Sequence, residues 1–312
     1  MESAIRVSGL KKAYKNNAVL QGVDFTVESG TIFALLGSNG AGKTTIINIL
    51  TTLIEADSGD ATVNGFDVAK SPDKVRQCIS LTGQFAAVDD VLSARENLEL
   101  IGDLRHVSNS TQTATDMLEK FKLTDAADRM VSTFSGGMRR RLDIAMSLIG
   151  NPPIIFLDEP TTGLDPEARN GMWQTIRSLA KNGTTVFLTT QYLEEADELA
   201  DSIALLHEGK IVAKGTAAEL KKLVPGGFVK FTFDDEKQLK ETFAILKKDY
   251  EVVEGSNMTL TVAVGDSTAQ TAKLFIHLRD AKLEPANFSQ QVPTLDDVFF
   301  KLTGHKNQKE DK

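Results

Sequence analysis

A glycine-rich segment, "GSNGAGKTT" from Gly37 to Thr45, constrains the fold more than any other feature of the sequence. It fits the pattern G-x-x-x-x-G-K-[ST], and it lies between an apolar run, "TIFALLG", and a segment with helical spacing, "TTIINILTTL". Glycines let such a loop turn its backbone N–H groups toward phosphate oxygens, and the helix N-terminus adds its positive end. The alternative is a tight strand–helix turn that binds nothing. The complete match favours a phosphate-binding loop, in which Lys43 reaches the β- and γ-phosphates and the Thr44 hydroxyl binds Mg²⁺.

The rest of the N-terminal two thirds alternates between predicted strands and helices. Apolar strands are expected at "PIIFLDEP", "TTVFLTT" and "SIALLHEG", with the helix "ARNGMWQTIRSLAKN" between the first two. Such alternation predicts an α/β fold, a mostly parallel sheet with helices on both faces. Residues from about 90 to 150 have helical patterns throughout and are interpreted as a helical insert.

A Pro-Gly-Gly turn in "KKLVPGGFVKF" breaks this pattern and indicates a domain boundary. We therefore predict a first domain over residues 1–223 and a second over residues 224–304. The second shows the order βαββαβ, which is typical of a ferredoxin-like α+β domain. The polar residues 305–312 are predicted to be a disordered tail.

Composition excludes some classes of function. Asp and Glu number 43 against 35 Lys and Arg, a formal net charge of -8, which argues against a general nucleic-acid binder. The single cysteine, Cys78, cannot form an internal disulfide and indicates a reducing compartment. No apolar run approaches the ~18 residues that span a bilayer, and the N-terminus has no signal-peptide core. We therefore expect a cytoplasmic protein, which would need another chain to cross a membrane.

Polar side chains stand at the ends of two predicted buried strands, where α/β proteins place their chemistry. Asp158 and Glu159 end the strand in "IIFLDEP". Asp158 is suited to hold Mg²⁺ through water, and Glu159 to act as general base or to orient the attacking water. The alternative is two acids in a solvated loop. Gln191 follows the strand "TTVFLTT" in the same way.

The run "FSGGMRRRLDIAMSLIGNPPIIFLDEPTTGLDP", which follows "GSNGAGKTT" in the chain, resembles the signature, Walker B and D-loop segments of ABC-transporter ATPases. The resemblance covers roughly residues 4–220. Within that family, "TTQYLEEAD", "SGGMRRRLD" and "PTLDDVFFKLTG" are most similar to the daunorubicin/doxorubicin-resistance (ABC-2 type) exporter ATPases. The resemblance to this family implies a P-loop ATPase domain with an antiparallel β subdomain and a helical subdomain. It also implies ATP and Mg²⁺ as ligands, a homodimer in the ATP-bound state, and a separate transmembrane permease that holds the chain at the cytoplasmic face of the cell membrane.

The resemblance also assigns roles to individual residues. Those implied to bind ATP are Tyr14, Gly37, Ser38, Asn39, Gly40, Ala41, Gly42, Lys43, Thr44, Thr45 and Gln84. Tyr14 would stack on adenine, and Gln84 would join Thr44 and Asp158 at Mg²⁺. Ser135, Gly136 and Gly137 would contact the ATP held by the other subunit, and Asp165 of the D-loop would couple the two sites. Glu96, near Gln84, is a candidate region of contact with the permease.

Gln191 lies where most members of the family have a histidine that contacts the γ-phosphate and the catalytic water. A glutamine amide can donate to a phosphate oxygen and accept from water at once, so Gln191 is assigned as a catalytic residue beside Glu159. The alternative is a strand-end glutamine bonded to backbone. Arg139, Arg140 and Arg141 are interpreted as a solvated helix face, with contact with a partner as the alternative, and Trp173 is interpreted as part of the core.

The function predicted from these observations is ATP hydrolysis that powers export of a drug, an antibiotic or another amphiphile. The αβ pattern of the C-terminal region favours an exporter, because sugar-importer ATPases of the family carry an all-β domain there. Export of a lipid or polysaccharide stays an alternative. A non-transport ABC ATPase is disfavoured by the single cassette, and a non-hydrolysing regulator by the intact Lys43 and Glu159.

Overall fold

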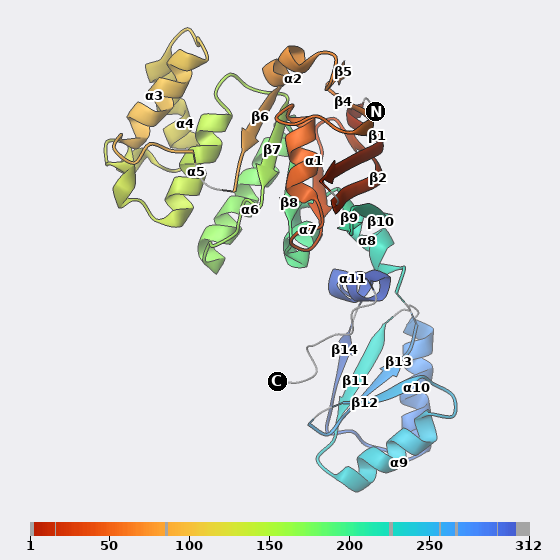
Figure 1. The fold of residues 1–312 in the computed structure, drawn as a ribbon. Coiled ribbons are helices and arrows are strands. Elements are labelled where there is room, and N and C mark those ends of the chain that lie inside the picture. Colours follow the sequence, from red (N-terminus) through yellow and green to blue (C-terminus); the bar gives the residue numbers. More distant parts are fainter. Residues whose placement is uncertain are drawn as a thin grey trace. The chain divides into compact units, whose positions relative to one another are not determined.

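The computed structural model describes residues 3–15, 17–84, 87–224, 227–255, 257–265, 268–291 and 293–303. The chain forms two compact units, residues 1–217 and 218–312 (Figure 1). The boundary predicted after residue 223 lies slightly C-terminal of this division, and the tail predicted for residues 305–312 lies outside the described residues.

A six-stranded sheet forms the centre of the first unit. Its strand order is β10-β9-β3-β8-β7-β6, and all neighbours are parallel except β10 and β9. This confirms the predicted mostly parallel sheet. Strands β3, β7 and β8 are buried along their whole length, as expected for strands covered on both faces. The strands are β3 (Ile32–Leu36), β6 (Ile79–Thr82), β7 (Ile154–Asp158), β8 (Thr185–Thr190), β9 (Ser202–His207) and β10 (Lys210–Gly215).

A second sheet of the same unit is antiparallel, with the order β2-β1-β4-β5. Its strands are β1 (Ser3–Tyr14), β2 (Asn17–Glu28), β4 (Ser58–Val63) and β5 (Phe66–Asp67). Four phenylalanines connect the two sheets: Phe25 of β2 stacks on Phe33 at 5.2 Å, and Phe187 lies 5.3 Å from both Phe33 and Phe156. Such aromatic pairs stabilise a core beyond the area they bury.

Several helices of this unit begin where the sequence supplies capping residues. Ser93 and Glu96 form a capping box before α3, and Asp165 caps α6 ahead of Pro166. Three helices, α3, α4 and α5, lie within the predicted insert and gather beside the β6 edge of the sheet (Figure 1). The helices are α1 (Lys43–Leu50), α2 (Pro72–Cys78), α3 (Ala94–Leu104), α4 (Ser110–Lys120), α5 (Gly136–Ser147), α6 (Pro166–Lys181) and α7 (Leu193–Leu199), with 3₁₀ turns at Thr124–Ala126 and Val131–Thr133. Helix α8 (Ala217–Lys221) begins at the last residue of this unit and continues in the second.

The second unit contains a four-stranded antiparallel sheet with the order β12-β13-β11-β14. Leu239 and Leu246 of α9 and Leu274 of α10 pack with Phe231 and Leu260 of the sheet in its core. Its elements in chain order are β11 (Phe228–Thr232), α9 (Glu236–Leu246), β12 (Val252–Gly255), β13 (Thr259–Ala263), α10 (Thr268–Asp280), β14 (Asn287–Gln291) and α11 (Leu295–Thr303).

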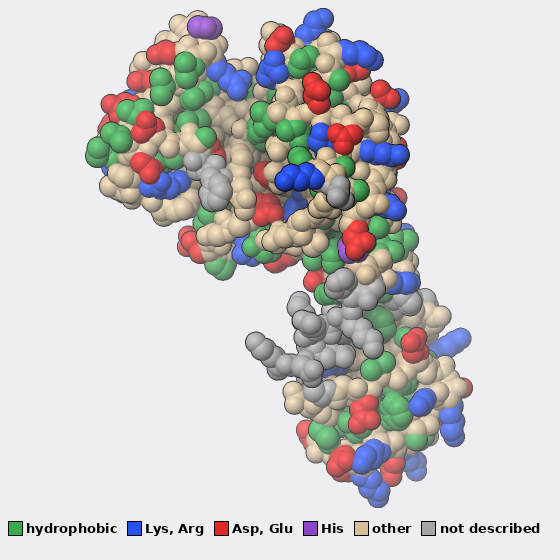
Figure 2. Space-filling view, in the orientation of Figure 1, with side chains coloured by type: hydrophobic (Ala, Val, Ile, Leu, Met, Phe, Trp, Pro, Cys, Tyr) green, Lys and Arg blue, Asp and Glu red, His purple; other side chains and the backbone are tan. Residues whose placement is uncertain are grey.

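The surface is charged and mixed in sign. Acidic and basic side chains intermingle over both units on the face that Figure 2 shows. Among the described residues, none of the helices has the length and apolar character needed to cross a membrane.

Candidate functional site

Three neighbouring strands of the large sheet end at one edge. Leu36 of β3 pairs with Thr190 of β8, and Asp158 of β7 pairs with Thr189. The backbone N–H of Gly37 donates to the carbonyl of Thr190 at 3.2 Å. The glycine-rich loop, Glu159 and Gln191 therefore leave the sheet side by side, which is where open parallel sheets place their ligands.

The loop after β3 depends on glycine for its shape. Gly42 has a φ of 111°, and a Cβ there would lie 2.7 Å from Leu20 Cδ2 and 3.2 Å from the carbonyl oxygen of Val19. A Cβ on Gly37 would lie 2.5 Å from the carbonyl oxygen of Leu206. Helix α1 then begins at Lys43 without a side-chain cap, so its first N–H groups face outward to receive an anion.

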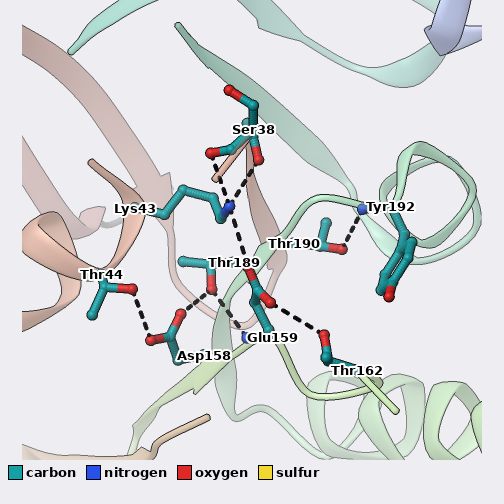
Figure 3. A network of polar contacts seen from close by, with 10 residues as sticks. Ser38, Lys43, Thr44, Asp158, Glu159, Thr162, Thr189, Thr190 and Tyr192 are labelled. Carbon is teal, nitrogen blue, oxygen red and sulfur yellow. Dashed lines mark hydrogen bonds and ion pairs between the residues drawn. The ribbon is translucent and has the colours of Figure 1, made fainter. Parts of the chain in front are cut away.

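The ammonium of Lys43 lies at the centre of the site (Figure 3). Its side chain is 5% exposed, and Nζ donates to the carbonyls of Gly37 at 2.8 Å and Ser38 at 3.3 Å. It also forms an ion pair with Glu159, 3.2 Å from Oε1. A buried cation ringed by backbone oxygens and one acid is placed to receive a second anionic group.

Asp158 holds two hydroxyl groups with its two carboxylate oxygens. Oδ2 accepts from the Thr44 hydroxyl at 3.1 Å, and Oδ1 accepts from the Thr189 hydroxyl at 2.5 Å (Figure 3). Hydroxyl and carboxylate oxygens are the ligands that Mg²⁺ prefers, and in proteins it takes its remaining ligands from phosphate and water. Within the described part of the chain there is no group of three or more His, Cys, Asp or Glu side chains that could hold a metal ion.

Glu159 adopts a left-handed backbone conformation, with a φ of 49°. For a residue other than glycine this costs roughly 1–3 kcal/mol, and it persists only where the surroundings impose it. Its N–H donates to the carbonyl and hydroxyl oxygens of Thr189 at 3.2 and 3.1 Å, and Oε2 accepts from the Thr162 hydroxyl at 3.2 Å. The turn directs the carboxylate toward Lys43.

These groups line a cavity of about 460 Å³, within the usual size of small-molecule sites. Its lining residues are Asn17, Val19, Ser38, Asn39, Gly40, Gly42, Lys43, Thr44, Thr45, Gln84, Asp158 and Glu159. Most of the residues assigned to ATP and Mg²⁺ from the sequence are among them. Sequence reasoning missed Asn17 and Val19, which open strand β2 and belong to no motif.

Four residues assigned to the site lie outside the cavity lining: Tyr14, Gly37, Ala41 and Gln191. Tyr14 is 47% exposed at the end of β1, with the Lys12 ammonium 5.7 Å from its ring centre. Gln191 is half-buried directly after β8, and its side chain forms no hydrogen bond with the described residues. The roles of Tyr14 at adenine and Gln191 at the γ-phosphate stay predictions.

The signature and D-loop residues lie together in another place. Ser135 caps α5 by accepting from the N–H of Met138 at 3.3 Å, and Asp165 accepts from the N–H of Ala168 at 2.8 Å. Ser135, Gly137 and Asp165 line a cavity of about 620 Å³ that includes none of the residues lining the Lys43 cavity.

The expectation that all three signature arginines are solvated is wrong for Arg140. Its side chain is only 7% exposed, because α5 turns it toward the end of β7. Arg139 is 30% exposed and pairs with Asp90 at 2.5 Å. Glu96 forms part of the capping box of α3, accepting from the Ser93 N–H at 2.7 Å.

Glu195 of α7 is a buried acid that sequence reasoning missed. Its Oε1 accepts from the Thr161 hydroxyl at 2.8 Å and from the Trp173 indole N–H at 3.3 Å. Burial raises the pKa of Glu195, and hydrogen bonds from Thr190, Thr161 and Trp173 partly oppose that rise. Trp173 is 7% exposed, which confirms its predicted place in the core.

Comparisons with known proteins agree with this geometry. Residues 20–162 match the family model described as ABC transporter. The chain is 43% identical over 310 residues to the daunorubicin resistance ATP-binding protein DrrA2 of Streptomyces coeruleorubidus, covering 98% of this chain and 96% of that one. It is 44% identical to the daunorubicin/doxorubicin resistance ATP-binding protein DrrA of Streptomyces peucetius, covering 97% and 93%. It is 36% identical to the Nod factor export ATP-binding protein I of Rhizobium sp. strain N33, covering 98% and 99%.

Solved structures show the same fold. An ATP-binding subunit of an ABC transporter aligns with a TM-score of 0.63 at 29% identity, covering 70% of this chain and 92% of that one. A dimeric ATP-binding cassette bound to ADP and Pi aligns with a TM-score of 0.62 at 24% identity, covering 68% and 98%. The extent of the sequence identity shows that this chain belongs to the ABC transporter family, as an ATPase subunit close to the daunorubicin/doxorubicin resistance ATP-binding proteins.

Proposed function

We propose that this chain hydrolyses ATP to power export of drugs of the daunorubicin and doxorubicin type. The observation that carries the ATPase chemistry is the cluster of Lys43, Glu159, Thr44 and Asp158 in one cavity at the mouth of the glycine-rich loop. The substrate class rests on the resistance proteins of Streptomyces, which share 43–44% identity with nearly the whole chain.

In this proposal the loop N–H groups and the Lys43 ammonium hold the phosphates of ATP. Thr44 and Asp158, with Gln84 at the cavity wall, would hold Mg²⁺. The metal, when bound, neutralises charge on the phosphate oxygens. Glu159 acts as general base toward the attacking water, or orients it, and Gln191 contacts the γ-phosphate and that water from the end of β8.

We also propose that two copies pair and share their nucleotides. The separate cavity that holds Ser135, Gly137 and Asp165 supports this, because those residues lie apart from Lys43 within one chain. A nucleotide bound at Lys43 would then meet the N-terminus of α5 of a second copy. The related cassette bound to ADP and Pi is itself a dimer.

A separate transmembrane permease is the partner that we propose for the dimer, with the chain peripheral at the cytoplasmic face of the cell membrane. The names of the relatives, ATP-binding proteins of drug resistance and of Nod factor export, support this role. For the second unit we propose a ferredoxin-like domain spanning about residues 224–304. The order β11-α9-β12-β13-α10-β14, with β11 and β13 at the centre of the sheet, supports that proposal.

The second candidate for the substrate is the Nod factor or a similar amphiphile, because the Rhizobium exporter protein is 36% identical over nearly the full length. The lower identity places it behind the drug-resistance function. A non-hydrolysing regulator is disfavoured, since Lys43 and Glu159 are in contact in the cavity.

The test compares the wild type with Glu159→Gln. The purified wild-type chain should release phosphate from ATP when Mg²⁺ is present, and Glu159→Gln should bind ATP but release phosphate about 10²- to 10⁴-fold more slowly. Cells that co-express the wild-type chain and its permease should accumulate less daunorubicin than cells with Glu159→Gln. If the two cell lines accumulate equal amounts of daunorubicin although the wild-type chain hydrolyses ATP normally, the proposed drug substrate is contradicted, whereas the proposed ATPase activity is not. If the wild-type chain does not hydrolyse ATP, the proposed ATPase activity is contradicted, and with it the proposed export function.

A further inference from the structure

One buried side chain contacts both backbone carbonyls that flank Glu159. The guanidinium of Arg140 donates from Nη2 to the carbonyl of Asp158 at 3.0 Å and from Nε to the carbonyl of Pro160 at 3.1 Å. The residue between them, Glu159, has the left-handed φ of 49°. Arg140 therefore bridges the strained turn that directs the Glu159 carboxylate toward Lys43.

The same guanidinium reaches a third segment. Nη1 donates to the carbonyl of Gly83 at 2.6 Å and to Oδ2 of Asp143 at 3.2 Å. Oδ1 of Asp143 in turn accepts from the N–H of Ala87 at 3.1 Å. Arg140 and Asp143 thus fix residues on both sides of Gln84, which lies in the wall of the Lys43 cavity.

Both members of this pair belong to α5, the helix that Ser135 caps. They stand three residues apart and on one face of the helix, with side chains 7% and 6% exposed. Arg140 follows Ser135 by somewhat more than one helical turn and Gly137 by slightly less than one. A shift of α5 would therefore reach the Glu159 turn through a single rigid side chain.

We propose that Arg140, oriented by Asp143, is a positioning residue for Glu159 and couples its carboxylate to the signature helix. This inference rests on the proposed role of Glu159 in hydrolysis. Arginine is required because its planar fork offers donors in several fixed directions. A lysine would keep the charge beside Asp143, but its compact ammonium cannot reach the carbonyls of Asp158, Pro160 and Gly83 together.

The test uses Arg140→Lys, Arg140→Met and a matched control, Arg139→Met, in the same helix. Arg140→Lys should lower kcat by about tenfold to a hundredfold, because a displacement of about 1 Å in a catalytic group can cost that much. Its KM for ATP and its affinity for the fluorescent analogue TNP-ATP should stay near wild type, since Arg140 contacts no residue of the glycine-rich loop. Arg139→Met should hydrolyse ATP like the wild type.

Hydrogen–deuterium exchange provides a readout that does not depend on turnover. Arg140→Lys should speed amide exchange in peptides that contain Glu159 and in those that contain Gln84, whereas Arg139→Met should not. Wild-type kcat and wild-type exchange in Arg140→Lys would overturn the inference. A parallel loss of kcat, TNP-ATP affinity and melting temperature would also overturn it, because that result indicates a purely structural role.

Arg140→Met leaves Asp143 buried without its partner and can fail to fold, in which case Arg140→Lys decides the question alone. The proposed function and this inference fail separately. A wild-type chain without ATP turnover contradicts the function, while the exchange of the Glu159 peptide still tests the positioning. Normal turnover in both the wild type and Arg140→Lys contradicts only the positioning.

Discussion

The ion pair between Lys43 and Glu159 predicts that Glu159→Gln binds ATP more tightly than the wild type. The two side chains lie 3.2 Å apart and are 5% and 12% exposed, so water screens them little. The phosphates of ATP need the same ammonium that Glu159 now neutralises. Replacing the carboxylate by a neutral amide of the same shape removes the competitor and keeps the packing.

The structure sets the size of this effect. At 3.2 Å and an effective dielectric constant of about 20, the gross attraction between the two charges is roughly 5 kcal/mol. Desolvation of both ions offsets most of it, which leaves a net contribution of about 1–2 kcal/mol. Freed from that contact, Lys43 should bind the phosphates about 5- to 30-fold more tightly.

Titration with TNP-ATP in the presence of Mg²⁺ measures the affinity, and phosphate release measures turnover. Glu119→Gln is the matched control, because it makes the same charge change on the exposed face of α4. Turnover by Glu159→Gln should fall by about 10²- to 10⁴-fold, the usual contribution of a general base. An affinity equal to that of the wild type would refute the competition for Lys43, and undiminished turnover would remove Glu159 from the mechanism.

Three further changes test other parts of the structure. Gln191→Ala should slow ATP hydrolysis by about tenfold or more with little change in TNP-ATP affinity, and unaffected turnover would make Gln191 structural. Phe187→Ala should lower the free energy of unfolding by about 3–5 kcal/mol in urea titrations, since Phe187 packs against Phe33 and Phe156 at the centre of the core. Burial raises the pKa of Glu195, so the native state holds its proton to higher pH than the unfolded chain and the wild type loses stability as pH rises through that window. The stability of Glu195→Gln relative to the wild type should therefore increase as pH rises above the usual titration range of a glutamate, and a difference that does not change with pH would contradict a raised pKa.

Features encoded in contiguous segments could be predicted from the sequence. The buried strands β3, β7 and β8 each carry at least four consecutive uncharged residues, and the glycine-rich loop, Asp158 with Glu159, and Gln191 stand at or just after their ends. Their parallel pairing and the shared edge therefore follow from the pattern. Short elements could not be recognised in this way. Strand β5 has two residues and β6 has four, too few to establish a period, and only pairing with β4 and β7 makes them strands.

The burial of Arg140 depends on tertiary packing, and three consecutive arginines in the sequence do not show which of them is buried. Three consecutive arginines point in three directions around a helix, and only packing against β7 selects the middle one. One signal was present: Asp143, three residues on, is the one charged residue in the mostly apolar run "LDIAMSLI". An acid within an apolar helix face requires a buried partner, and Arg140 is the arginine on the same face.

Glu159 is held at two points, its carboxylate and its backbone. We expect ATP binding to change the first contact and the position of α5 to set the second. Its carboxylate contacts Lys43, the residue that the phosphates of ATP would claim. Its backbone is bridged by Arg140, which belongs to the helix that Ser135 and Gly137 would present to the nucleotide of a second copy. Nucleotide binding would release the side chain, while the position of α5 would fix the turn from which that side chain extends. A productive position for the base therefore requires both, and a chain that binds ATP without a partner should hold Glu159 free of Lys43 but not yet set for hydrolysis.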